Sequence, residues 1–363
     1  MRSARQSRPG SLAKEGGGKI GESMGSENRA EQAPGRRVLV TGGSGFIGTN
    51  VVRAYLRDGC AVLNVDTAPP RMPALRSSWH DADILEAEAL QQAFAAFRPD
   101  LVVHLAAKTV LNERTDLEHY AANIQGVQNL IEAVQATAGV ERTFFASSRL
   151  VFRLGHVPKD DLDYNPSTLY GLSKVRGEQL VRAAGTSLGT WTIVRPTGIW
   201  GPWFGVPYRD FFRSIERGTY VHPRGRDAKK SYGYVENTVH QLQKLAVASP
   251  AAVHGRTFVL ADYPPLSVRS WATLIQEALG ARPIRSVPTP MLKAAALAGD
   301  ALERLGLRAP LTSFRLNNLT SDMLYDTSSL EELVGPLPYD AAEGVKRTVA
   351  WLRQAGGSGS TEA

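Results

Sequence analysis

The sequence contains a single cysteine, Cys60, among its 363 residues. One chain therefore has no second thiol with which to form a disulfide, and such sparing use of cysteine is typical of proteins in a reducing compartment. No apolar run approaches the roughly 18 residues that a membrane-spanning helix needs. The N-terminal segment also lacks the continuous apolar stretch of a secretory signal. We therefore expect a cytoplasmic protein without a membrane span.

Excess charge of one sign is also scarce outside the N-terminal segment. The formal charge is +7, and residues 1–37 hold eight Arg or Lys and four Glu. More than half of the excess therefore lies in a Gly- and Ser-rich segment without apolar periodicity. We interpret residues 1–35 as a disordered basic tail and not as a nucleic-acid-binding arm. Met24 is an alternative start, and residues 355–363 have the composition of a second flexible tail.

Between the tails, short apolar runs alternate with helical patterns. Most of the runs are apolar throughout, as expected of parallel strands that are buried on both faces. They cover residues 37–41, 61–66, 101–105, 143–147, 192–196 and 257–260. Helices are expected over residues 116–137 and 168–184, among others. This alternation predicts an α/β protein with a Rossmann-type, doubly wound parallel sheet.

The pattern changes after about residue 197, where Pro and aromatic residues cluster. We therefore assign residues 36–196 to the sheet domain, with later contributions from about 232–260. Residues 197–231 and 261–354 would form a smaller, C-terminal substrate domain. Within the latter, the stretch 291–307 is apolar on one side but contains four charged residues. It predicts a packed amphipathic helix and not a membrane anchor.

The first predicted strand leads into the turn Thr41-Gly-Gly-Ser-Gly-Phe-Ile-Gly48 and then into a helical pattern. Such a turn lets phosphate oxygens approach bare backbone at a helix N-terminus, where unpaired N–H groups and the helix dipole favour negative charge. The predicted phosphate cradle consists of Gly42, Gly45, Phe46, Ile47 and Gly48. Three such glycines alone also mark ordinary turns. Whether this turn binds phosphate therefore has to be judged from other parts of the sequence.

Asp66 ends the second predicted strand, 18 residues after Gly48. In a dinucleotide fold, a carboxylate at this position hydrogen-bonds the adenosine ribose hydroxyls. It would also repel the additional phosphate of NADP. The sequence therefore favours NAD, while Arg71 nearby keeps NADP as an alternative. A simple turn aspartate is the competing explanation for Asp66.

Other residues at predicted strand ends could border the same cofactor. Asp83 and Ile84 can reach adenine, although Asp83 is nearly as well explained as a helix cap. The side chains of Leu105, Ala106 and Ala107 would let the cofactor lie close to the backbone. His104, which precedes them, is better explained as a satisfied strand histidine than as a catalytic group.

Tyr170 and Lys174 stand at positions i and i+4, on one face of the helix expected over 168–184. A tyrosine with a pKa of about 10 is a poor base at neutral pH, but a neighbouring ammonium and a positively charged nicotinamide stabilise its phenolate. Tyr170 could then take a hydroxyl proton while hydride passes from carbon to the nicotinamide. Ser148, 22 residues earlier, can hold the reacting oxygen against it. A surface pair and a turn serine are the alternatives.

In combination and order, these motifs resemble those of the extended short-chain dehydrogenase/reductase family, the nucleotide-sugar epimerase and dehydratase group. The resemblance extends from about Val38 to Trp351. It rests on the 41–48 turn, Asp66, residues 104–107 and 123–126, Ser147 with Ser148, Tyr170 with Lys174, and residues 195–202.

The resemblance implies that Ser148, Tyr170 and Lys174 form a catalytic triad. It further implies that Lys174 holds the nicotinamide ribose and that the backbone from Pro196 to Ile199 borders the nicotinamide. The helix that carries Asn123 and the helix that carries Tyr170 would build a homodimer interface. No metal is implied.

Two departures from the family pattern bear on the reaction. The Asp-Glu pair that performs acid–base work in the 4,6-dehydratases is replaced by Arg149-Leu150, which argues against dehydration. The arginine that often grips the sugar-nucleotide phosphates appears as Lys230, which neutralises phosphate without the two-pronged geometry of Arg. We expect Arg149, Arg209 and Lys230 to edge the substrate cleft, and Lys108 to face cofactor or substrate.

The first functional hypothesis is an epimerase of a nucleotide-linked sugar that keeps NAD bound. The second is an NAD(P)-dependent dehydrogenase or reductase of a keto sugar or a sterol-like alcohol, because the C-terminal pattern also resembles bacterial sterol dehydrogenases. A cofactor-binding regulator on the same fold is a third, non-enzymatic hypothesis, which the intact serine–tyrosine–lysine set disfavours. The aromatic residues of 203–212 could stack a nucleobase, although core packing explains them better.

Overall fold

The computed structural model describes residues 35–111, 116–225, 227–307, 309 and 311–357. Most of both predicted tails lies outside these residues. Seven strands form one parallel sheet in the order β11-β6-β5-β4-β1-β2-β3. Their bounds are β1 (Arg37–Thr41), β2 (Ala61–Val65), β3 (Trp79–His80), β4 (Leu101–His104), β5 (Arg142–Ala146), β6 (Thr190–Pro196) and β11 (Thr257–Leu260).

The six predicted strands are therefore confirmed to within two residues, and the predicted doubly wound parallel sheet is confirmed with them. The two-residue strand β3 was not predicted, because a run this short has no periodicity to read. The strand order reverses direction at β1, with β2 on one side and β4 on the other. In open α/β sheets, ligands bind beyond the carboxyl ends of the strands at such a reversal.

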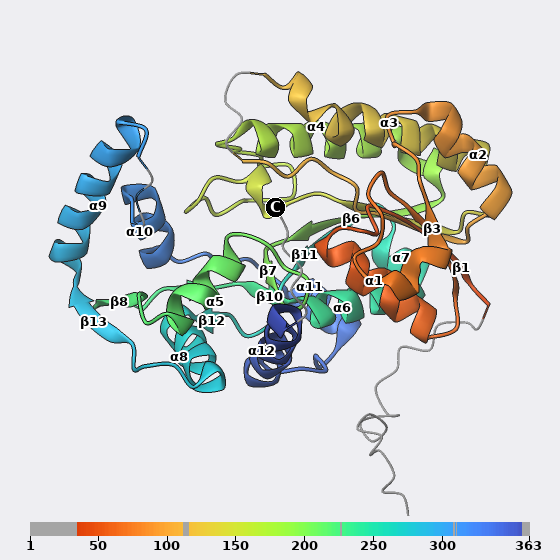
Figure 1. Cartoon of the computed structure of the whole chain (residues 1–363). Helices are drawn as coiled ribbons and strands as arrows, with labels where there is room; N and C mark the ends of the chain where they lie inside the picture. Colours follow the sequence, from red (N-terminus) through yellow and green to blue (C-terminus); the bar gives the residue numbers. More distant parts are fainter. Residues whose placement is uncertain (1–34, 112–115, 226, 308, 310, 358–363) are drawn as a thin grey trace, which may run out of the picture.

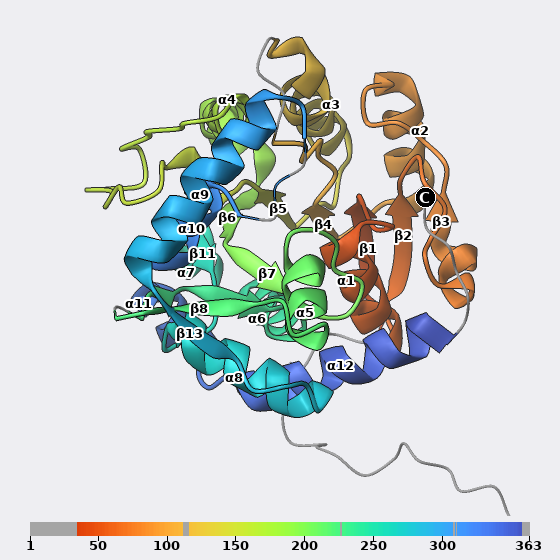
Figure 2. The ribbon, with the colours of Figure 1, turned by 60° about the vertical axis from the view of Figure 1, so that its left-hand side comes forward.

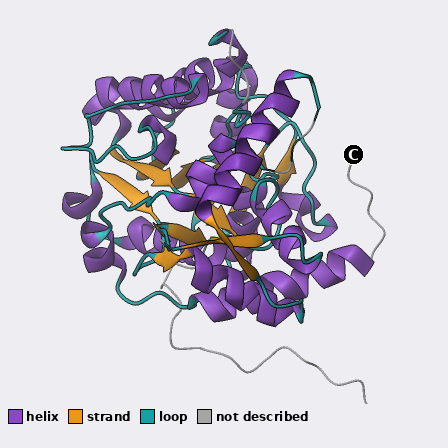
Figure 3. Cartoon of the chain, turned by 90° about the vertical axis from the view of Figure 1, so that its left-hand side faces the viewer, coloured by secondary structure: helices purple, strands orange, loops and turns teal. Residues whose placement is uncertain are grey.

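Helices cover both faces of the sheet, as Figures 1 and 3 show. One layer contains α2 (Ala87–Phe97), α3 (Ala121–Ala136) and α4 (Leu169–Ala184), and the other contains α1 (Phe46–Arg57), α6 (Val235–Val247) and α7 (Pro250–Val253). Each layer has its own apolar core against the strands. The predicted helix at 168–184 begins at Leu169, because the hydroxyl of Thr168 caps it by accepting a hydrogen bond from the Gly171 amide at 3.0 Å.

The helix α11 (Ser328–Val334) packs Leu330 and Val334 into the apolar core of the layer that contains α1 and α6. The remaining elements form the second part of the chain. They comprise α5 (Tyr208–Glu216), α8 (Val268–Leu279), α9 (Thr289–Arg304), α10 (Ser313–Thr320) and α12 (Ala341–Gly357), and the short strands β7 (Gly198–Trp200), β8 (Val221–Arg224), β9 (Lys229–Lys230), β10 (Tyr232–Tyr234), β12 (Leu266–Ser267) and β13 (Arg285–Pro288). α12 continues to Gly357, into the segment expected to be a flexible tail.

An aromatic core holds this second part of the chain together. Trp200, Phe204, Phe212 and Trp271 are all buried, and their rings contact one another. Aromatic pairs of this kind contribute about 0.5–1.5 kcal/mol each beyond the burial of their area. Core packing is therefore the observed role of most of the aromatic residues between 203 and 212.

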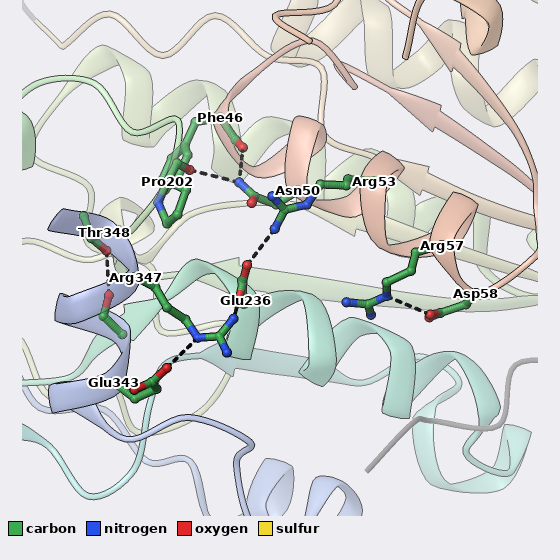
Figure 4. Close-up of polar contacts among 11 residues, drawn as sticks. Phe46, Asn50, Arg53, Arg57, Asp58, Pro202, Glu236, Glu343, Arg347 and Thr348 are labelled. Carbon is green, nitrogen blue, oxygen red and sulfur yellow. Dashed lines mark hydrogen bonds and ion pairs between the residues drawn. The ribbon is translucent and has the colours of Figure 1, made fainter. Parts of the chain in front are cut away.

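A chain of polar contacts joins α1 to the C-terminal helix (Figure 4). The carboxylate of Glu236 pairs with Arg53 of α1 at 2.6 Å and with Arg347 of α12 at 3.3 Å. Asn50 of α1 donates a hydrogen bond to the carbonyl oxygen of Pro202 at 3.1 Å. The helix that follows the glycine turn is thus fixed to both parts of the chain.

Candidate functional site

A cleft of about 840 Å³ opens at the carboxyl ends of the parallel strands. This volume is typical of sites for cofactors and small molecules. The structure places every residue of the predicted cofactor set along it: Gly42, Gly45, Phe46, Ile47, Gly48, Asp66, Asp83, Ile84, Leu105, Ala106, Ala107, Tyr170, Lys174, Pro196 and Ile199. Residues from six separate chain segments therefore meet at one site.

The glycine turn presents backbone to this cleft. Gly42 has a φ of +72°, and a Cβ on it would lie 2.5 Å from the Ala106 amide nitrogen, so no other residue fits there without a shift. Gly45 caps α1 without a side-chain hydrogen bond, and the first turn of the helix carries no acidic residue. The N–H groups and the positive end of the dipole of α1 are consequently left for an anion from outside the chain.

Asp66 lies at the mouth of the turn and fixes the loop around it. Its two carboxylate oxygens accept hydrogen bonds from the amides of Ser44 and Ala68, each at 2.9 Å. Arg71, the candidate for an NADP phosphate, donates from Nε to the Ser44 carbonyl at 3.1 Å and from Nη1 to the Trp203 carbonyl at 2.8 Å. Two of its donor nitrogens are therefore committed to backbone oxygens, which weakens the case for a phosphate-binding role.

Ser148, Tyr170 and Lys174 come together on the opposite wall of the cleft. The hydroxyl of Ser148 lies close enough to the Tyr170 phenol to lower its pKa, and it accepts a hydrogen bond from the Leu150 amide at 3.1 Å. A Cβ on Gly171 would lie 2.2 Å from the Leu150 carbonyl oxygen. Only glycine after Tyr170 lets α4 approach the serine segment this closely.

Burial dominates the protonation of these groups. It raises the pKa of Tyr170 to about 12, against opposing contributions from the Ser148 hydrogen bond and the charge of Arg149. Burial also lowers the pKa of Lys174 to about 8, and the charge of Glu178 opposes this shift. The ammonium of Lys174 donates to the Ala146 carbonyl at 2.9 Å. The expected lowering of the tyrosine pKa is therefore not supplied by the chain alone, and it requires the charge of a bound cofactor.

His104 is a buried strand histidine, but it is satisfied only at Nδ1, because its buried Nε2 has no hydrogen-bond partner within the described residues. Its Nδ1 is hydrogen-bonded to the Thr41 hydroxyl at 2.7 Å, and the side chain is buried. Burial and the charge of Lys174 lower its pKa to about 3, so the imidazole is neutral at physiological pH.

Asn123 has a positioning role that the sequence did not reveal. Its side chain, buried in α3, accepts from the Lys108 amide at 2.8 Å and donates to the Lys108 carbonyl at 3.0 Å. The same Nδ2 donates to the Ser173 hydroxyl on α4 at 2.9 Å. Asn123 therefore fixes the loop after β4 to the helix that carries Tyr170 and Lys174.

The expected substrate residues are only partly at the cleft. Lys108 lines it, whereas Arg149, Arg209 and Lys230 are not among its lining residues. Lys230 is buried in β9, where its ammonium donates to the Asn318 carbonyl of α10 at 2.7 Å, and burial lowers its pKa to about 8. The substrate-edge role of Lys230 therefore stays a prediction. The charge of Arg149 acts on Tyr170 and on Tyr208.

Several lining residues were not predicted, among them Ser44, Thr67, Ala122, Gly205, Val206, Pro207 and Tyr208. Most of them adjoin a predicted residue in sequence, so the strand-end rule could have included them. The segment 204–208 carries no such signal, because it reaches the cleft through the packing of Phe204 against Phe46. Within the described residues, no group of three or more His, Cys, Asp or Glu side chains could hold a metal ion.

The family model described as the NAD dependent epimerase/dehydratase family matches residues 38–261. The chain belongs to this family, as the resemblance predicted. It is an enzyme family of the extended short-chain dehydrogenase/reductase type, with nucleotide-sugar epimerases among the structural neighbours of this chain and sterol dehydrogenases among its relatives.

Two relatives span most of the chain. The 3 beta-hydroxysteroid dehydrogenase/Delta 5-->4-isomerase of Mycobacterium tuberculosis is 30% identical over 80% of this chain and 81% of its own. The N-acetyl-alpha-D-glucosaminyl-diphospho-ditrans,octacis-undecaprenol 4-epimerase of Escherichia coli O157:H7 is 26% identical over 86% of this chain and 94% of its own. The crystal structure of the Bordetella bronchiseptica enzyme WbmG in complex with NAD and UDP has the same fold, with a TM-score of 0.67 and 23% identity over 89% of this chain and 96% of that one.

The residues present fit a nicotinamide dinucleotide. The uncapped N-terminus of α1 offers N–H groups to a pyrophosphate, and the carboxylate of Asp66 lines the same cleft. The small side chains of Ala106 and Ala107 leave the floor of the cleft close to the backbone. The main support for a dinucleotide is that one cleft is lined both by the glycine turn and by Ser148 and Tyr170.

Proposed function

We propose that the protein is an NAD-dependent epimerase of a nucleotide-linked sugar. The observation that carries the proposal is the placement of Ser148, Tyr170 and Lys174 together in the cleft that begins at the glycine turn. When bound, NAD accepts a hydride from the carbon that bears the reacting hydroxyl. Tyr170 accepts the hydroxyl proton and Ser148 holds the oxygen. After the keto sugar has turned, Tyr170 would return the proton to the oxygen as the hydride comes back from the reduced cofactor to the other face of the carbonyl carbon, so the reaction would need no external reductant.

The absence of the Asp-Glu pair supports epimerisation over dehydration in this proposal. Water loss requires an acid and a base beside the tyrosine, and the positions after Ser148 carry Arg149 and Leu150. The charge of Arg149 lowers the pKa of Tyr170 against the effect of burial. Arg149 therefore favours the phenolate form that removes a proton.

A second candidate is an NAD(P)-dependent dehydrogenase or reductase of a keto sugar or a sterol-like alcohol. Two observations favour it. Only Lys108 of the four expected cationic residues lines the cleft, which leaves few charges for a diphosphate. The relative that is 30% identical is named as a hydroxysteroid dehydrogenase.

The proposal is tested on protein purified without added cofactor. We expect about one NAD per chain to remain bound, and conversion of a UDP-, GDP- or dTDP-sugar to its epimer without added NAD. Product analysis by NMR measures the conversion. Cofactor-free protein that turns over a sugar or sterol only when NAD is supplied, with net NADH formation, would contradict the epimerase and support the dehydrogenase.

Asp66→Ala tests the assignment of NAD over NADP. Removal of the carboxylate takes away the ribose hydrogen bonds and the repulsion of a 2′-phosphate, which together are worth about 1–3 kcal/mol. We therefore expect the Kd ratio of NADP to NAD, measured by calorimetry, to fall by at least tenfold. Asp83→Ala, at the adenine end of the same cleft, is the matched control and should leave the ratio unchanged. An unchanged ratio in Asp66→Ala would remove this carboxylate from the ribose.

A further inference from the structure

Helix α9 is apolar on two sides, and only one of them is covered. Leu292 and Ala296 pack against Leu316 of α10, which is the partnered side. The other side is exposed and consists of Met291, Ala294, Ala295, Leu297, Ala298, Ala301, Leu302 and Leu305. The sequence predicted an amphipathic helix at this place, with its polar side outward. The outward side is instead the larger apolar one.

The exposed residues form one continuous face. At about 100° per residue, they occupy roughly 160° of the helix circumference, centred opposite the packed side. Leu297 is 66% exposed and Leu305, at the C-terminal end of the helix, is 76% exposed. Phe314, on the adjoining helix α10, is 74% exposed. An apolar face of this extent is unusual on a protein surface unless it has a partner.

The position of this face suits a partner outside the chain. Figure 1 shows α9 along the outer edge of the molecule, with α10 between it and the other elements. Figure 2, turned toward this edge, shows α9 running along the front of the molecule. No helix of the described residues is long and apolar enough to cross a membrane.

Charge at the margin of the face favours an anionic surface. Exposed Lys293 and Arg304 stand along one edge of the apolar arc. Asp300, beside them, accepts a hydrogen bond from the Ser313 amide at 2.9 Å, and Glu303 lies on the opposite side of the helix. A helix with an apolar face bordered by Lys and Arg lies in the plane of an anionic membrane interface.

A second copy of the chain fits this face less well. A stable protein interface takes roughly 20–30 residues from each partner, whereas the apolar face of α9 with Phe314 supplies nine, and four of them are alanine. Two copies would also bring Lys293 and Arg304 toward the same cations of the partner. We propose that the outward face of α9, together with Phe314, docks the protein on an anionic lipid surface.

A hydrogen bond connects the docking helices to the rest of the second part of the chain. Lys230 of β9, which does not line the cleft, donates to the Asn318 carbonyl of α10. The proposal concerns binding alone and stands whether the enzyme is an epimerase or a dehydrogenase.

The test is co-sedimentation of the full-length protein with vesicles of phosphatidylcholine alone and of phosphatidylcholine mixed with phosphatidylglycerol. We expect binding to the mixed vesicles that weakens with salt. The double variant Leu297→Gln/Leu305→Gln, which changes no charge, should bind at least tenfold more weakly. Val157→Gln/Leu162→Gln removes two equally exposed apolar side chains elsewhere and should bind like the unaltered protein.

A second variant keeps the test decisive if the first folds poorly. Lys293→Gln/Arg304→Gln leaves the apolar face intact and should reduce binding to the mixed vesicles severalfold. The proposal would be overturned if Leu297→Gln/Leu305→Gln and Lys293→Gln/Arg304→Gln both bound the mixed vesicles as well as the unaltered protein does. Failure of the unaltered protein to bind would also overturn it. Light scattering that shows Leu297→Gln/Leu305→Gln dissociating an oligomer, with no vesicle binding at any stage, would assign the face to a second copy of this chain.

Discussion

Tyr170→Phe should lower kcat by about 10²–10⁴-fold, the usual contribution of a positioned acid–base group, and leave the affinity for NAD nearly unchanged. The phenol of Tyr170 is the group beside Ser148 that can accept the proton of the substrate hydroxyl. The ring itself contacts Tyr120 at a centroid distance of 6.1 Å and is retained in phenylalanine. Single-turnover kinetics measures the loss, and calorimetry measures NAD binding.

The matched control is Tyr120→Phe. Tyr120 is buried beside Tyr170, and its hydroxyl donates to the Val110 carbonyl, while its charge contributes to raising the pKa of Tyr170. Its removal should affect stability more than kcat. If Tyr170→Phe retained more than a tenth of the activity, or if Tyr120→Phe lost as much, the base would have to be sought elsewhere.

The pKa values sharpen this expectation. Burial raises the pKa of Tyr170 to about 12 in the chain without cofactor, so the phenolate is rare at neutral pH. Lys174 is the cation of the triad, and its ammonium donates a hydrogen bond to the Ala146 carbonyl. The tyrosine can act as a base only when further positive charge enters the cleft. Binding of oxidised cofactor and activation of the base are therefore coupled.

The cofactor half of the site could be predicted because it depends on local rules. Residues at the carboxyl ends of parallel strands meet at one edge, so Asp66 and Ala106 could be placed from the strand pattern alone. The positions of Tyr170 and Lys174 followed from helix geometry. None of these inferences needed knowledge of how distant segments pack.

The substrate half could not be predicted in this way. Lys230 lies on a two-residue strand, and its ammonium is held by a hydrogen bond to the carbonyl of Asn318, 88 residues away. Arg71 is held by the Trp203 carbonyl, 132 residues away. Such contacts arise from the packing of short elements that carry no periodic signal. The exposed apolar side of α9 was missed for a related reason, since a sequence pattern does not show which side of an apolar helix is covered.

The buried pair between Arg195 and Glu178 should have the largest effect on stability. Both side chains are nearly inaccessible, and two hydrogen bonds of 2.8 and 2.7 Å join the guanidinium to the two carboxylate oxygens. Removing one partner of such a pair leaves an unpaired buried charge and costs about 3–5 kcal/mol. Arg195→Met should therefore lower the free energy of unfolding, measured in urea, by this amount.

Two further variants show whether the loss of stability in Arg195→Met comes from the ion pair or from other contacts of Arg195. Arg182→Met removes a more exposed arginine, 3.8 Å from the same carboxylate, and should cost less than about 1 kcal/mol. Arg195→Met/Glu178→Leu removes both charges and should recover part of the loss, because an apolar pair leaves no buried charge. A double variant as unstable as Arg195→Met would show that packing against Phe152, and not charge, explains the effect.

The same pair links stability to the active site. Glu178 follows Lys174 by one helical turn, and its charge opposes the lowering of the Lys174 pKa by burial. In Arg195→Met, the carboxylate would lose its principal partner, and its charge would act on Lys174 without the opposing charge of the guanidinium. We then expect Lys174 to keep its ammonium form to a higher pH than in the unaltered protein, so the alkaline limb of the pH–rate profile should shift upward. An unchanged limb would confine Arg195 to a structural role.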